Sequence, residues 1–194
     1  MPKVCITLVS LLTLALAAGA QAQVLPRDAS LRYSEQLSNG SAGNCGCFTL
    51  QGAAADANWS LGHITNALHL GLAADAGIEH TGNANGAGYG LTLLTLAAGP
   101  RFTIPVSKTQ TFAQALVGLA HGSGSQFPQS GNLLTASANS VAFDLGAGVD
   151  YSLKKRLSLR ILQLDYLRTA LPNDVNNWQN NLRVSAGVTL HFSH

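Results

Sequence analysis

The sequence predicts an all-β protein, an eight-stranded antiparallel up-and-down transmembrane β-barrel. Three observations lead to this prediction. Hydrophobic and polar residues alternate along many stretches, short and long connections follow one another in strict order, and only 10% of the residues are charged. A soluble domain carries about 25% charged residues, whereas a chain whose outer surface meets lipid does not need them.

The first 22 residues have the features of a secretory signal peptide. Lys3 supplies a positive charge, residues 4–18 are apolar but too short to span a membrane as a helix, and Ala20 and Ala22 form an A-x-A cleavage site. An uncleaved N-terminal anchor is the alternative. The remainder, residues 23–194, is long enough for one barrel domain.

Eight stretches read as strands; the period of two that gives one apolar face is clear in three of them and noisier in the rest, and the stretch at 111–121 is apolar on both faces apart from Gln114. In chain order they cover residues 30–37, 47–59, 66–80, 90–102, 111–121, 140–151, 156–168 and 181–194. The last stretch is the clearest, since Arg183, Ser185 and Thr189 alternate there with leucine, valine and phenylalanine. The first stretch has the weakest pattern, and it completes the count of eight.

Two of these stretches break the alternation. In the seventh, Arg160 has even parity and Asp165 has odd parity, so a β-bulge near residues 161–162 is needed to point both the same way. In the second, Gln51 and Asp56 conflict in the same manner.

Short turns and long loops alternate along the chain. The short polar turns cover residues 60–66, 105–110 and 152–156. The long loops, rich in Gly, Asn and Ser, cover residues 38–46, 81–88, 122–139 and 169–180. An antiparallel meander with all its long loops at one end is the simplest arrangement that satisfies this order.

The charged residues decide which face of each strand meets lipid. An arginine on the lipid face near the middle of the bilayer costs about 2–4 kcal/mol, so Arg183 must face inward. Every backbone polar group in hydrocarbon must be paired, so the sheet must close. A secreted soluble barrel of the lipocalin type would show the reverse orientation, with an apolar interior and a charged exterior.

The inward charges are expected to form an ion-pair network that fills the lumen and fixes the strand register, because a buried charge without a partner is costly. The residues expected in this network are Asp75, Glu79, Arg101, Asp144, Asp150, Arg160, Asp165 and Arg183. A narrow conducting pathway lined by the same groups is the alternative. Eight strands leave an interior barely wider than its side chains, which disfavours a large pore.

The cysteines and the charge balance exclude other classes. Cys45 and Cys47 are spaced for a small local disulfide or for two unpaired thiols, and no neighbouring ligands complete a metal site. The net charge of +2 without a basic block gives no reason to expect nucleic acid. No cofactor is expected.

An enzymatic function has little support in the sequence. His121 lies close to Ser123 and Ser125 at the start of the third long loop. A G-x-S-x-G elbow is missing, and nothing identifies an acid that would orient the histidine. We therefore expect a protein that is not an enzyme.

Several of these stretches resemble a known family. The NCGCF segment before the second strand, GPRF at 99–102, FAQALVGLAHG at 112–122 and the terminal strand ending near Phe192 are similar to the small eight-stranded outer-membrane β-barrels of Gram-negative bacteria, the OmpA-like or porin-family barrel domain. The resemblance covers nearly all of the chain after the signal peptide.

The resemblance implies a place in the bacterial outer membrane, with lipid around the barrel and insertion by the barrel assembly machinery. A structural or surface-interaction role in the cell envelope follows from it, with long loops that can meet an extracellular partner. The alternative is a narrow porin-like channel for ions or small solutes. We expect a monomer.

Overall fold

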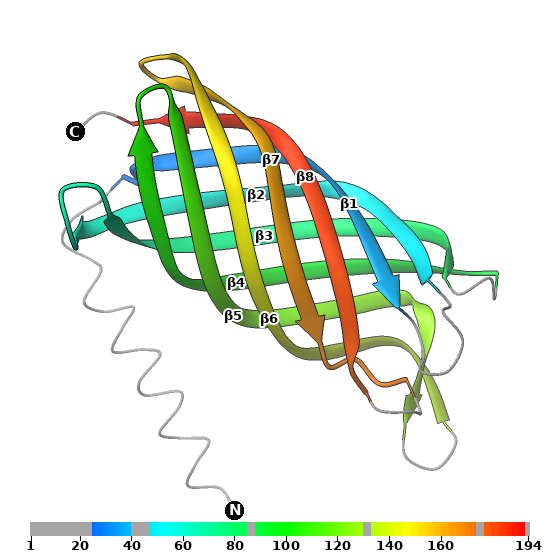
Figure 1. Cartoon of the computed structure of the whole chain (residues 1–194). Helices are drawn as coiled ribbons and strands as arrows, with labels where there is room; N and C mark the ends of the chain where they lie inside the picture. The colour runs from blue at the N-terminus through cyan, green and yellow to red at the C-terminus, as the bar shows by residue number, and fades with distance from the viewer. Residues whose placement is uncertain (1–24, 40–46, 85–87, 130–132, 174–176, 193–194) are drawn as a thin grey trace, which may run out of the picture.

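Eight antiparallel strands close into a barrel in the computed structural model, which describes residues 25–39, 47–84, 88–129, 133–173 and 177–192 (Figure 1). Each strand pairs with its neighbours in the chain, and β8 closes the ring onto β1. The strands are β1 (Asp28–Asn39), β2 (Cys47–His63), β3 (His69–Ala84), β4 (Tyr89–Val106), β5 (Thr109–Gln129), β6 (Leu133–Lys154), β7 (Leu157–Thr169) and β8 (Gln179–His191).

The predicted eight-stranded up-and-down barrel is confirmed, including the first strand with its weak pattern. The predicted signal peptide, residues 1–22, lies outside the described residues and stays a prediction. Cys45 also lies outside them, and only the backbone of Cys47 is described, so the possible disulfide stays a prediction too. No helix within the described ranges has the length and apolar character that a membrane crossing would require.

Side chains alternate between an apolar outer wall and a polar interior. On β3, Asp75 and Glu79 are buried, whereas Ile78 between them is 53% exposed. The outer wall carries many large hydrophobic side chains, among them Leu31, Leu96, Val117, Leu119, Leu145 and Ile161. Such an exterior is unfavourable in water and suits hydrocarbon.

The bulge expected in the seventh stretch is present. The pairing of β7 with β8 shifts between Arg160 and Gln163, and Ile161 and Leu162 both point outward. Because the bulge inserts one residue, the side chains before and after it reach the same interior. The conflict in β2 has a different solution, since Gln51 simply faces outward and no bulge separates it from the buried Asp56.

The long segment 122–139, expected as a loop, is mostly strand. β5 and β6 continue their ladder to the pair Gln129 and Leu133 and project beyond the rest of the barrel (Figure 1). A register shift between Ser123 and Phe127 bends this hairpin. Phe127, which lies in this segment, is turned inward and is only 6% exposed.

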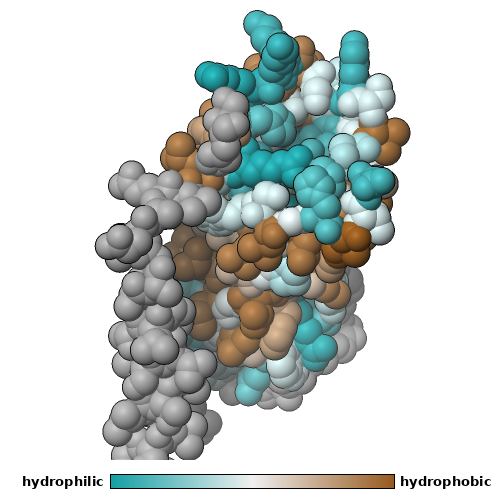
Figure 2. All heavy atoms as spheres, turned by 90° about the vertical axis from the view of Figure 1, so that its left-hand side faces the viewer, coloured by the Kyte–Doolittle hydropathy of each residue, from teal (hydrophilic) through white to brown (hydrophobic). Residues whose placement is uncertain are grey.

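The two ends of the barrel differ. We call the end with the three short turns the turn end and the opposite end the loop end. The turn end carries a group of cationic side chains, namely Arg27, Lys108, Lys154, Lys155 and Arg156. Figure 2 looks onto this end and shows hydrophilic side chains gathered in its upper part, with hydrophobic side chains below them.

Because the outer wall faces lipid, the cost of placing an arginine on it should depend sharply on the depth of the position in the membrane. Leu96 and Val106 face outward on β4 and are 61% and 60% exposed, but Leu96 lies in mid-strand and Val106 adjoins a turn. We expect Leu96→Arg to lower the free energy of unfolding by about 2–4 kcal/mol and Val106→Arg by about 0–1 kcal/mol. Urea titration of both variants in phosphatidylcholine vesicles measures this, and equal losses would contradict a membrane-embedded wall.

Candidate functional site

The interior of the barrel is filled by buried charged side chains. Seven carboxylates and four guanidinium groups are each 4% exposed or less. They are Asp28, Arg32, Asp56, Asp75, Glu79, Arg101, Asp144, Asp150, Arg160, Asp165 and Arg183. We call this set the lumen network. Its members face inward from seven of the eight strands. The eighth strand, β5, contributes the neutral side chain of Gln114.

Arg183 on β8 is the centre of one half of the network. Its Nη2 donates to Asp75 Oδ1 at 2.8 Å and to Asp144 Oδ2 at 3.0 Å, and its Nε donates to Asp165 Oδ2 at 3.1 Å. Glu79 Oε1 lies 3.7 Å from Nη1. One guanidinium therefore connects carboxylates of β3, β6 and β7 across the lumen.

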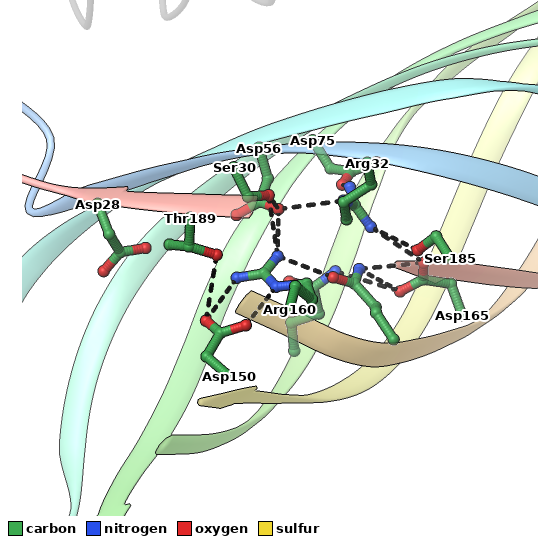
Figure 3. A network of polar contacts seen from close by, with 12 residues as sticks. Asp28, Ser30, Arg32, Asp56, Asp75, Asp150, Arg160, Asp165, Ser185 and Thr189 are labelled. Atoms are coloured by element: carbon green, nitrogen blue, oxygen red, sulfur yellow. Dashed lines mark hydrogen bonds and ion pairs between the residues drawn. The ribbon is translucent and has the colours of Figure 1, made fainter. Parts of the chain in front are cut away.

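Asp56 on β2 is the centre of the other half. Arg101 Nη1 donates to Asp56 Oδ1 at 2.7 Å, and Arg160 Nη1 donates to Oδ2 at 2.5 Å. Arg160 also donates through Nε and Nη2 to the two oxygens of Asp150, at 2.7 and 2.9 Å. Figure 3 shows Arg160 between Asp150 on one side and Ser30 and Asp56 on the other. Two-pronged bonds of this kind fix the geometry of both partners.

Arg32 on β1 joins the two halves. Its guanidinium donates to Asp75, and its Nε lies 3.4 Å from Asp56 Oδ2 while Nη1 lies 3.6 Å from Asp165 Oδ2. Asp75 is thus shared between Arg32 and Arg183. The network is continuous from one half of the lumen to the other.

Neutral side chains complete the packing between the charges. Gln114 Oε1 accepts from Arg101 Nε and Nη2 at 2.9 and 2.6 Å, and Gln163 Nε2 donates to both oxygens of Asp165. Two guanidiniums contact the ring of Phe112, with the Cζ atoms of Arg101 and Arg160 each 4.5 Å from its centroid. Such cation–π contacts are favourable when the cations are shielded from water.

Two glycines provide the space that the charged groups occupy. A β-carbon at Gly146 would lie 2.1 Å from Asp165 Oδ1, and one at Gly77 would lie 2.6 Å from Arg183 Nη1. These two inward glycines therefore face charged side chains of the lumen network.

The structure brings together all eight residues that the sequence assigned to the lumen. The sequence interpretation missed Asp28, Arg32 and Asp56. Arg32 shares its parity with Ser30 and Gln36, in alternation with outward leucines, and this signal could have identified it. Asp56 was missed because the polar Gln51 on the same strand has the opposite parity, so the pattern did not show which of the two faces inward.

The acids outnumber the arginines, and two carboxylate oxygens within the described interior have no hydrogen-bond donor. These atoms are Glu79 Oε2 and Asp144 Oδ1. Both residues lie on the side of the network that faces the loop end. Their neighbours there are apolar, because Leu93 pairs with Glu79 and Leu167 pairs with Asp144 in the strand register.

A cluster of apolar side chains, which we call the apolar layer, lies above the network beside the buried polar Gln36 and Asn181. It consists of Leu50, Leu93, Ala120, Phe127, Ala142, Leu167 and Leu171, none more than 6% exposed. Gly122 allows Phe127 to enter this layer, since a β-carbon there would lie 2.6 Å from Phe127 Cζ. The interior thus changes along the axis from charged in the middle to neutral, with apolar and uncharged polar side chains, near the loop end.

Other candidate chemistry has little geometric support. The ring of His121 places Nδ1 2.7 Å from Asn139 Oδ1, so its recorded partner is an amide and not a carboxylate. Among the described residues, no three His, Cys, Asp or Glu side chains are grouped to hold a metal ion.

An apolar outer wall, a closed ring of strands and a charged interior define an integral outer-membrane β-barrel. The sequence profile of the outer membrane protein beta-barrel domain matches residues 7–192. The chain belongs to this family, and the protein resides in the bacterial outer membrane. A search of curated protein sequences found no match.

Solved structures of small outer-membrane barrels have the same fold. Neisserial surface protein A superposes with a TM-score of 0.56 and 15% identity, over 85% of this chain and 96% of that one. The outer membrane enzyme PagL gives 0.52 and 14%, over 83% and 99%. Ail, the attachment invasion locus protein of Yersinia pestis, gives 0.50 and 11%, over 87% and 100%. At such identities the likeness concerns the fold alone.

The central position of Arg183 predicts a large effect of its removal. Arg183→Gln leaves several buried carboxylates without their cation, so we expect a loss of about 3–5 kcal/mol in the free energy of unfolding. Arg168→Gln is the matched control, because Arg168 faces outward and only stacks on Trp178; we expect a loss below about 1 kcal/mol. Urea titration in vesicles compares them, and similar losses would show that the lumen bonds contribute little.

The carboxylates themselves should differ in importance. Asp165 lies near two arginines and receives hydrogen bonds at both oxygens, whereas Glu79 has one oxygen without a donor. We expect Asp165→Asn to cost about 3 kcal/mol or more and Glu79→Gln about 1 kcal/mol or less. The same titration tests this order, and a larger loss for Glu79→Gln would refute the partner assignment.

Proposed function

We propose that the protein is a closed, non-conducting barrel that anchors and displays its loop end at the cell surface. The observation that carries this proposal is the filled lumen. Five side chains of the lumen are only 0–1% exposed to water, namely Arg32, Arg183, Glu79, Gln36 and Gln163. A continuous aqueous path would leave such side chains accessible.

The proposed orientation puts the turn end in the periplasm and the loop end outside. Outer-membrane barrels have short periplasmic turns and longer extracellular loops. The hairpin of β5 and β6 projects at the loop end, and near its tip Leu133 and Leu134 are 65% and 58% exposed. Exposed leucines on a projecting hairpin support contact with an extracellular partner.

The narrow channel remains the competing function, and two features argue against it. The charges in the lumen bind one another, and the apolar layer lies across the axis above them. An ion would have to break several short bonds and then pass the section of the lumen that holds the apolar layer and no charged side chain among the described residues. Both barriers disfavour conduction in this conformation.

The remaining parts of the proposal concern partners and catalysis. Insertion by the barrel assembly machinery and a monomeric state fit a ring whose strands are all paired, which leaves no free edge for another chain. A role without catalysis fits His121, whose recorded partner is an amide. Purified protein should accordingly show no hydrolysis of ester bonds in outer-membrane lipids.

Planar-bilayer recording tests the closed barrel directly. We expect refolded protein to give no discrete openings, because the lumen offers no water-filled path. Folding is verified on the same sample by its changed gel mobility before and after boiling. Reproducible single-channel steps from protein that shows the folded mobility would overturn the proposal in favour of a channel.

A further inference from the structure

We propose that the loop end of the lumen is a binding pocket for one neutral amphiphilic small molecule. A cavity of about 300 Å³ lies there, inside the barrel mouth and above the apolar layer. Its apolar walls include Phe48, Leu93, Phe127 and Leu171, and Thr169 and Asn181 add polar atoms. The volume lies at the lower end of the range for small-molecule sites, about 300–1,000 Å³.

The pocket has rigid walls. Phe48, Leu93 and Phe127 come from β2, β4 and β5, so strand pairing fixes their backbones. The segment after β7 is fixed by the side chain of Gln179, whose Oε1 accepts from the Leu171 amide at 2.9 Å and whose Nε2 donates to the Leu171 carbonyl at 2.8 Å. A site that exists before its ligand arrives loses less entropy on binding.

The floor of the pocket makes it a dead end. Leu93 borders the cavity and also pairs with Glu79, the first carboxylate of the lumen network below. The apolar layer, with the buried Gln36 beside it, lies between the pocket and the charged interior. A molecule that enters from the loop end has to leave by the same opening, so the site binds its ligand and does not transmit it.

The lining determines the class of ligand. None of the described residues that border the cavity is Asp, Glu, Lys, Arg or His. A charged ligand would lose its hydration there without gaining a counter-ion, which is costly. Aromatic and aliphatic walls next to amide and hydroxyl groups suit an apolar chain or ring with a hydroxyl or amide head, such as a medium-chain alcohol.

Photolabelling tests the pocket. The protein is reconstituted in phosphatidylcholine nanodiscs, which leave both ends accessible, and an octanol bearing a diazirine is the probe. We expect saturable labelling of peptides that line the cavity, with competition by unlabelled octanol. Labelling confined to outward-facing residues, or labelling that rises in proportion to the probe without saturation, would overturn the proposal.

Two alanines on β3 give a matched pair of variants. Ala84 borders the cavity and is 6% exposed, so Ala84→Phe fills the pocket and should reduce its labelling at least tenfold. Ala76 faces outward on the same strand, so Ala76→Phe should leave the labelling unchanged. If Ala84→Phe does not show the folded gel mobility, Ser125→Phe at the rim takes its place. Equal labelling of filled and unfilled pockets would refute the site.

Charge provides the last discrimination. Octanoate and octylammonium probes with the same diazirine should label the pocket at least tenfold less than the neutral alcohol, and comparable labelling would refute the predicted ligand class. Entry from outside the cell rests on the orientation proposed above. The nanodisc experiment does not depend on that orientation or on conductance, so its failure would leave the closed barrel untouched.

Discussion

Hydrogen-bonded ion pairs between arginines and carboxylates inside the barrel are the interaction on which the architecture depends. A soluble barrel gains stability by burying apolar side chains in its interior. In a membrane the apolar side chains already have a suitable solvent outside, so the interior needs another source of cohesion. Arg32, Arg101, Arg160 and Arg183 provide it by joining carboxylates on distant strands.

The same bonds specify the strand register. Side chains along a strand alternate between its two faces, so a slip by one residue would turn Arg183 toward lipid and Val184 toward the buried acids. The network also crosses the seam, since Arg32 on β1 and Arg183 on β8 share Asp75 on β3. The ion pairs that neutralise these buried charges therefore also hold together the two strands that close the ring.

Polarity changes along the barrel axis, and this change gives the two ends different properties. The middle of the lumen is charged and filled, and the apolar layer around Leu93 and Leu167 lies on its loop-end side. Two carboxylates next to that layer, Glu79 and Asp144, keep an oxygen without a donor. Above the layer the walls diverge into a cavity lined by neutral groups. One chain thus combines a filled interior with a cavity at its mouth.

Much of this arrangement was predictable from sequence because hydrocarbon imposes a strict period of two. The bulge at Ile161 and Leu162 followed from the parity of the charged residues on either side of it. Arg32 and Asp56 were missed, although both have the parity of inward residues. The alternation pattern of the first strand was weak, and in the second strand the polar Gln51 has the opposite parity to Asp56. Phe127 could not be placed, since its burial depends on the bend of a hairpin that local pattern does not encode.

A double-mutant cycle on Arg183 and Asp165 in lipid vesicles tests the central claim most directly. The two groups lie 3.1 Å apart with no exposure to water. The account predicts a coupling energy of at least about 1 kcal/mol, within the range for bonded neighbours. A coupling energy indistinguishable from zero would show that the arginines and carboxylates of the lumen do not hold this barrel together.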